Sequence, residues 1–290
     1  MFDPNRRQAA LTRAKRLAAH PKWDGDFLMR LAVDDLVERM GAVQRTFDFG
    51  IALNGRTDYL IQAMQKSGQV GQVVRVEEPG GWVGGGPVAE HTLTHLDLPA
   101  DSADVVLAPL TLHWADDLPG TLIQLRQILR PDGLLLAILP GPDTLAELRQ
   151  AFLTAEAEIM GGAALRVDPF TDIRDAGALL QRCGFALPVV DQDVLTVRYD
   201  NPLKLIADLR QFAATRQAVA SSPGLGRAVI GRMMEVYGDT ASDPDGRIRA
   251  SFSFVSLSGW VPHDSQQKPL KPGSAKMRLA EALNVEEKKV

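Results

Sequence analysis

The residues best suited to chemistry in this chain stand where apolar runs end. An apolar run from Val105 to Leu112 ends in His113-Trp114, and a second run, 134–140, is followed by Gly141-Pro142-Asp143. Because a histidine titrates near neutrality, His113 could act as an acid, a base or a substrate anchor. Trp114 offers a flat wall for a ring or a cation, unless it only packs under the next helix while His113 fixes the loop. We take His113, Trp114 and Asp143 as candidates for a substrate edge.

A glycine turn and an acid follow two earlier runs. Asp48, Gly50 and Ala52 lie in a β-rich segment, 46–53, which we expect to end in a turn before a helix. Glycine lets backbone approach a ligand closely, and a helix N-terminus offers free N–H groups to an anion. The pattern is not G-x-G-x-x-G, so a dinucleotide site is not indicated, and a simple turn is the alternative.

Glu77-Glu78 follows the next expected strand, 72–76. At such a strand end an acid can bind ribose hydroxyls. The alternative is a pair of solvated loop charges. A metal site is not indicated, because the histidines lack ligand spacing with acids and Cys183 is the single cysteine. A G-x-S-x-G nucleophile turn is also missing from the sequence.

The segment 104–141 predicts how these residues are positioned. Its leucines recur at helical spacing between the two apolar runs, Pro119 suits a first helical turn, and Arg130-Pro131-Asp132-Gly133 stops the helix. Two buried strands joined by a crossover helix predict a parallel sheet. Ligands of such sheets bind outside the carboxyl ends of the strands, where His113 and Asp143 are expected.

The remaining pattern alternates helices and strands. Helices are predicted over 5–19, 26–44, 59–66, 144–160, 172–183 and most of 202–237, and further strands over 91–96, 185–190, 194–199 and 248–261. This order predicts an α/β, doubly wound, mostly parallel sheet with an antiparallel edge strand and a helical insertion before the last strand. The expected divisions are N-terminal helices (1–45), an α/β core (46–200), the insertion (201–247), a final core strand (248–262) and a polar tail (263–290).

Composition narrows the classes of function. The 290 residues are 45% hydrophobic and 23% charged, which is typical of a globular protein, and the net charge of −4 gives no reason to expect nucleic acid. No apolar run is long enough to span a bilayer. The basic N-terminus is either a transit peptide or, as we favour, a solvated helix. We expect a bacterial cytoplasm, or alternatively a mitochondrial matrix, with at most peripheral membrane contact.

Taken in order, these segments resemble the class I S-adenosylmethionine-dependent methyltransferases. The resemblance rests on Asp48-x-Gly50, the acid at Glu77, the segment 98–104, Leu112-His113-Trp114 and the helix end at 129–133. It implies a Rossmann-like seven-stranded sheet with an antiparallel final strand, and S-adenosylmethionine as cofactor. The residues implied to bind it are Asp48, Gly50, Ala52, Glu77, Asp97, Leu98 and Thr111.

A narrower resemblance lies in the second half of the chain. The segments 141–149 (GPDTLAELR), 168–171 (DPFT), Gly259-Trp260, 264–266 and 272–275 are similar to the methyltransferase-like assembly factors of respiratory complex I. The malonyl-acyl-carrier-protein methyltransferases of biotin synthesis are more distantly similar. The resemblance implies a protein substrate, namely a complex I subunit, because the assembly factors are described as hydroxylating an arginine of such a subunit.

The cofactor loop departs from the family pattern, which usually reads Asp-Leu-Gly-Cys-Gly-x-Gly. Ala52 replaces the second glycine, Asn54 stands at the third, and Gly55 comes one residue late. Asp97 is a shifted candidate for the acid before Leu-Pro. Two classes of function follow. We favour an S-adenosylmethionine-dependent, methyltransferase-like protein that modifies a complex I subunit during assembly; the alternative is a catalytically silent binding factor of the same fold.

Overall fold

The computed structural model describes residues 2–20, 23, 25–168, 170, 172–217 and 224–267. Its helices are α1 (Pro4–Ala18), α2 (Phe27–Ala42), α3 (Tyr59–Lys66), α4 (Leu118–Ile128), α5 (Ala146–Met160), α6 (Ile173–Arg182), α7 (Pro202–Gln211) and α8 (Arg227–Ala241), with a 3₁₀ turn at Leu112–Trp114. Its strands are β1 (Phe47–Leu53), β2 (Val70–Glu77), β3 (Ala89–Glu90), β4 (Ala103–Pro109), β5 (Leu129–Pro140), β6 (Ala186–Tyr199) and β7 (Ile248–Trp260).

Local chemistry explains several helix starts. The Asp3 carboxylate accepts from the backbone N–H groups of Asn5 and Arg6, and a proline fills the first turn of α1. Asp117 caps α4 in the same way, with Pro119 in its first turn as predicted. The Asn201 side chain accepts from two N–H groups of α7.

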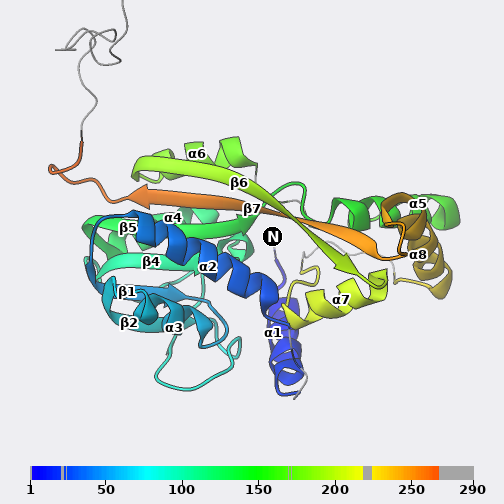
Figure 1. The fold of residues 1–290 in the computed structure, drawn as a ribbon, viewed down its shortest axis with the longest axis horizontal. Helices are drawn as coiled ribbons and strands as arrows, with labels where there is room; N and C mark the ends of the chain where they lie inside the picture. Colours follow the sequence, from blue (N-terminus) through cyan, green and yellow to red (C-terminus); the bar gives the residue numbers. More distant parts are fainter. Residues whose placement is uncertain are drawn as a thin grey trace, which may run out of the picture.

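The strands form one seven-stranded sheet in the order β3-β2-β1-β4-β5-β7-β6 (Figure 1). The five strands from β3 to β5 are parallel. β7 is antiparallel to both of its neighbours, β5 and β6. The predicted fold class is therefore confirmed, and the antiparallel pairing lies at the β7–β6 side of the sheet. Because β1, β2 and β4 are parallel, their carboxyl ends meet at one edge.

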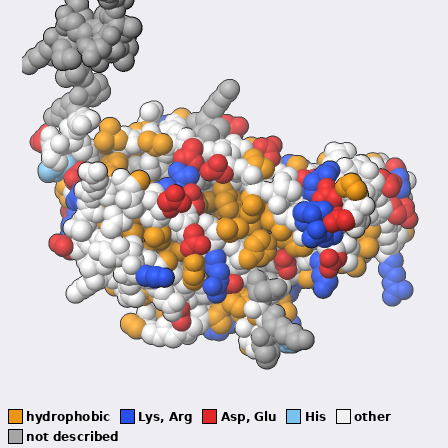
Figure 2. All heavy atoms as spheres, in the orientation of Figure 1, with side chains coloured by type: hydrophobic (Ala, Val, Ile, Leu, Met, Phe, Trp, Pro, Cys, Tyr) orange, Lys and Arg blue, Asp and Glu red, His pale blue; other side chains and the backbone are white. Residues whose placement is uncertain are grey.

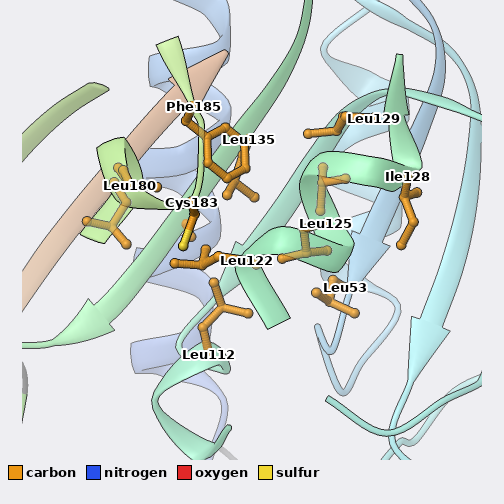
Figure 3. Packing of buried hydrophobic residues seen from close by; sticks show 14 of the residues in the cluster. Leu53, Leu112, Leu122, Leu125, Ile128, Leu129, Leu135, Leu180, Cys183 and Phe185 are labelled. Carbon is orange, nitrogen blue, oxygen red and sulfur yellow. The ribbon is translucent and has the colours of Figure 1, made fainter. Parts of the chain in front are cut away.

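Helices cover both faces of the sheet. Along β5, Leu135 and Ala137 face the cluster that contains α4 and α6, whereas Leu134 and Leu136 face the cluster that contains α2 and α3. This alternation is the period of two that a strand buried on both faces requires. Figure 3 shows Leu122 and Leu125 of α4 gathered with Leu53 of β1, Leu180 of α6 and the buried Cys183.

A third cluster forms a separate lobe. α5, α7 and α8 pack on the distal parts of β6 and β7, which run past the rest of the sheet toward α5 and α8 (Figure 1). Tyr237, completely buried in this lobe, donates from its hydroxyl to the carbonyl of Arg249. Figure 2 shows hydrophobic side chains gathered between the body of the sheet and this lobe, flanked by charges of both signs. The helical insertion predicted over 201–247 contains α7 and α8; the division boundaries stay a prediction.

Two predicted strand assignments are wrong. The segment 91–96 contains a turn closed by a bridge between Thr92 and His95, and the strand next to β2 is the shorter β3 before it. The segments 185–190 and 194–199 belong to one continuous strand, β6, because β7 pairs with it throughout. Between the two predicted segments, Asp191 pairs with Arg39 of α2.

No helix among the described residues is long and apolar enough to cross a membrane. Within the same residues, no group of three His, Cys, Asp or Glu side chains is placed to hold a metal ion. Of the segments that carry the family resemblance, Pro169, Thr171 and 272–275 lie outside the described residues.

Candidate functional site

A cavity of about 560 Å³ opens at the carboxyl edge of the sheet. Its polar end is lined by residues that follow β1, β2 and β4, and its apolar end by residues of β7 and helices α5 and α7. Of the predicted site residues, Glu77, Thr111, His113 and Trp114 line it. Its volume lies within the range of small-molecule sites, roughly 300–1,000 Å³.

The predicted cofactor residues of the first strand, Asp48, Gly50 and Ala52, lie outside the cavity wall. Gly50 is inside β1, paired with Val73, and a Cβ at that position would lie 2.8 Å from the Val70 side chain. Asp48 is exposed near the opposite, amino end of the strand, and Ala52 is buried in the core rather than in the cavity wall. The strand expected over 46–53 is confirmed as β1, and these three residues lie within it rather than in the turn that follows Leu53.

The turn at the end of β1 is formed by residues 54–58. Asn54 and Arg56 both adopt the left-handed backbone conformation, with φ of 53° and 60°. This conformation favours glycine, since a Cβ is crowded there. The loop thus has a glycine-like backbone at two positions that carry larger side chains, and both side chains line the cavity.

Asn54 ties three strand ends together. Its amide nitrogen donates to the Thr111 hydroxyl at 2.8 Å, and its amide oxygen accepts from the backbone N–H of Glu78 at 2.9 Å. Its own backbone N–H donates to the carbonyl of Val76. The ends of β1, β2 and β4 are therefore held in register around a buried amide.

Glu77 is buried at the end of β2, with 1% of its surface exposed. Its carboxylate accepts from the backbone N–H of Arg56 at 3.0 and 3.1 Å and from Nε of Arg75 at 2.9 Å. Arg75 also pairs with Asp58 at 2.6 Å. Burial outweighs these contacts and raises the pKa of Glu77 to about 7.

The Arg56 side chain lies beside this carboxylate without pairing with it. Its guanidinium donates only to the carbonyls of Gly81 and Gln211, at 3.4 Å. Burial, with a further contribution from Arg7, lowers the pKa of Arg56 to about 10. The group is therefore still charged at neutral pH.

Helix α1 closes one side of the polar end. Arg7 forms an ion pair with Glu78 and lies over the Trp114 ring, 4.7 Å from its centroid. Phe2 meets the same ring edge-on, with the centroids 5.5 Å apart. Trp114 thus packs against α1 while it lines the cavity.

His113 is a neutral side chain in this site. Burial and the nearby Arg7 lower its pKa to about 3. Its Nδ1 is buried and makes no hydrogen bond to any residue that the structure describes. An imidazole with such a low pKa is a weak base at pH 7, so it is better suited to hydrogen bonding than to general-base catalysis.

Three other predicted residues lie outside the cavity wall. Asp143 is exposed and accepts from Gln192 at 3.1 Å, while the next residue, Thr144, lines the cavity. Asp97 is exposed in the segment that precedes β4, and Leu98 packs against the core. The physical reason is that this segment approaches the amino end of β4, away from the carboxyl edge.

The apolar end of the cavity carries paired charges. Aromatic and aliphatic side chains such as Phe152 of α5 and Phe252 of β7 form its wall. Arg166 pairs with the buried Glu156, and Arg216 lies 3.8 Å from Asp168. The apolar end therefore suits an acceptor with an apolar stem and a polar tip.

Sequence reasoning missed Arg7, Arg56 and Asp168. Arg7 and Asp168 reach the cavity from segments distant along the chain, which no local pattern predicts. Asn54-Gly55 was a detectable signal for Arg56, since Asn-Gly marks turns.

The chain was compared with known proteins. The family model of a methyltransferase domain matches residues 57–137. The mitochondrial arginine hydroxylase NDUFAF5 of Rattus norvegicus is 30% identical over 86% of this chain and 75% of its own length. The Dictyostelium discoideum protein of that name is 39% identical over 62% of this chain. The chain spans only 42% of its length, and 57% of that of the Danio rerio protein.

A second group of relatives acts on an acyl carrier. The malonyl-[acyl-carrier protein] O-methyltransferase of Gallionella capsiferriformans is 34% identical over 58% of this chain and 55% of its own length. Among solved structures, a Bacillus halodurans protein assigned as a methyltransferase superposes with a TM-score of 0.51 at 12% identity. That match covers 79% of this chain and 100% of the other and reflects a shared fold.

Proposed function

Because the chain belongs to the family of the arginine hydroxylase NDUFAF5 and has a methyltransferase fold, we propose that it is an S-adenosylmethionine-binding assembly factor of respiratory complex I. The cofactor would lie in the polar end of the cavity. The observation that carries the proposal is Glu77, a buried carboxylate at the end of the second strand that lines this cavity. An acid in that place can accept hydrogen bonds from ribose hydroxyls.

The residues present fit such a ligand. Glu77 can orient the ribose, the neutral His113 has an unused ring nitrogen, and the Arg56 guanidinium has no carboxylate partner among the described residues. The cavity is large enough for a nucleoside with an amino-acid side arm. The fit differs from the family pattern at the β1 turn, where side chains stand at glycine-like positions.

When bound, S-adenosylmethionine would supply an electrophilic methyl group on a sulfonium. The chain's own part would be to hold and shield the reactants. Glu77 would fix the ribose, Trp114 and α1 would exclude water from one side, and the apolar end would receive the acceptor side chain. The acceptor would be a side chain of a complex I subunit, and the name of the relatives makes arginine the first candidate.

The comparisons do not favour the catalytically silent alternative, because the relatives of both groups are named as enzymes. We further propose a bacterial cytoplasm as the location, with a mitochondrial matrix as the alternative, since the NDUFAF5 relatives are named as mitochondrial and the acyl-carrier relatives are bacterial. Contact with the membrane would be peripheral and nucleic acid would not be a partner.

Calorimetric titration of the full chain with S-adenosylmethionine tests the ligand assignment. We expect saturable heat and a raised melting temperature, because a ligand that binds only the folded state stabilises it. The absence of both effects at millimolar ligand would contradict the proposal.

A further inference from the structure

Within the part of the chain that the structure describes, the Arg56 guanidinium at the polar end forms no ion pair with a carboxylate. Two other arginines, Arg7 and Arg75, lie near it. Arg7 pairs with Glu78, and Arg75 pairs with Asp58 and Glu77. Among the described residues Arg56 has only carbonyl acceptors, at 3.4 Å, and these long contacts leave donor capacity unused.

The backbone holds this side chain in place at a cost. A φ of 60° is unfavourable for arginine, and its backbone N–H donates to the Glu77 carboxylate. The other glycine-like position, Asn54, uses its side chain fully on Thr111 and Glu78. Arg56 therefore differs from Asn54, because its guanidinium makes only long contacts within the protein.

A half-buried cation without a paired anion has lost part of its hydration, and a ligand anion would offset that loss. A planar guanidinium can bind a carboxylate through two parallel hydrogen bonds. The Nδ1 of His113, buried in the same cavity wall, is a second polar atom without a partner in the described residues. Two independent observations thus indicate a polar ligand group at this end.

We propose that Arg56 forms the carboxylate subsite of the cavity and binds the carboxylate of the amino-acid arm of an S-adenosyl ligand. The inference rests on the proposed function and adds to it a residue two positions beyond the last glycine of the family pattern. It makes affinity depend on the amino-acid arm of the ligand. A nucleoside thioether without that arm forgoes the contact.

Calorimetry with two neutral-sulfur nucleosides tests the subsite. S-adenosylhomocysteine carries the amino-acid arm, and 5′-methylthioadenosine lacks it. For the unaltered full chain we expect S-adenosylhomocysteine to bind about 10- to 100-fold more tightly, as loss of a charge-assisted hydrogen bond implies. In Arg56→Gln the two affinities should converge, with that for 5′-methylthioadenosine changed less than about twofold.

Matched variants make the result specific. Arg13→Gln removes the same charge from an exposed position on α1 outside the cavity wall and should retain the full preference. Arg56→Lys keeps the charge but not the planar guanidinium, so its preference for S-adenosylhomocysteine over 5′-methylthioadenosine should be reduced. If Arg56→Gln does not fold, Arg56→Lys provides the test in its place. Equal binding of both nucleosides by the unaltered chain would overturn the subsite alone. Binding of neither would overturn the proposed function as well.

Discussion

A carboxylate as deeply buried as that of Glu77 needs hydrogen-bond partners, because they offset part of its lost hydration. It has two, the backbone N–H of Arg56 and the Arg75 guanidinium, yet burial still raises its pKa to about 7. The group can therefore carry a proton at neutral pH, so it could donate to a ligand as well as accept from it.

Glu77→Gln tests the ribose contact. The amide keeps the shape of the side chain but removes its charge, so we expect S-adenosylhomocysteine to bind roughly tenfold more weakly in a calorimetric titration. Arg75 keeps Asp58 as a partner, which limits unfolding. Glu78→Gln is the matched control and should bind like the unaltered chain. A loss confined to Glu78→Gln would contradict the assignment.

His113 predicts a pH dependence of stability. Its folded pKa of about 3 lies below the ordinary 6.5, so the unfolded chain binds the proton first as the pH falls. The stability that the neutral ring contributes is complete above pH 6.5 and is lost progressively down to about pH 3. Glu77 acts with the opposite sign between its ordinary pKa of 4.5 and about 7, because its folded pKa is raised.

His113→Gln should isolate this effect, since the Glu77 contribution is common to both proteins. Urea unfolding at pH 7.5 and pH 5 should show that the unaltered chain loses more free energy of unfolding than the variant does. The expected difference is roughly 1.4 kcal/mol for each pH unit below 6.5. Equal losses in the two proteins would show that the ring protonates freely in the folded state.

At the scale of elements, the turn 54–58 begins where β1 ends, at Leu53. Gly50→Ala separates packing from binding at this strand. The added Cβ would meet Val70 and Met64 at 2.8 and 2.9 Å, so we expect a loss of about 1–3 kcal/mol in the free energy of unfolding. Ligand affinity should be retained, because Gly50 lies outside the cavity wall.

Gly41→Ala on α2 serves as the control, since the added Cβ would lie 3.9 Å from the Gln69 side chain, which is an ordinary contact. Its stability should equal or exceed that of the unaltered chain. If Gly50→Ala instead abolished binding while leaving stability unchanged, Gly50 would belong to the ligand site after all.

The same strand shows what sequence patterns can predict. The pattern predicted α3 with its observed bounds, Tyr59–Lys66, and the β4–α4–β5 unit, because apolar periodicity reflects burial on these elements. The strand expected over 46–53 also matches β1, Phe47–Leu53, but the pattern did not show that Gly50 and Ala52 face the core of the sheet rather than the cavity.

Only part of the candidate site could be predicted from the sequence. Glu77, Thr111, His113 and Trp114 follow strands whose ends could be inferred, and they line the cavity. Thr144, the neighbour of the predicted Asp143, lines the cavity, because the geometry of a turn decides which of two neighbours faces inward. Arg7 comes from a helix about 70 residues away from its partner Glu78, and no local signal predicts such a contact.

In the whole molecule, the cavity joins two parts that the chain builds separately. The body of the sheet supplies the polar end through β1, β2 and β4, and the lobe of α5, α7 and α8 with β7 supplies much of the apolar end. A cofactor held by the body would thus face an acceptor received by the lobe.

Complementation in the host cell tests the central claim, that an S-adenosyl ligand bound at Glu77 is needed for complex I assembly. The measurement is complex I activity and assembled complex in cells that lack the gene. We predict that deletion lowers both, that the unaltered gene restores them, and that Glu77→Gln, expressed at the same level, restores them poorly. Intact complex I after deletion would contradict the assembly role, and full rescue by Glu77→Gln would contradict the role of the ligand.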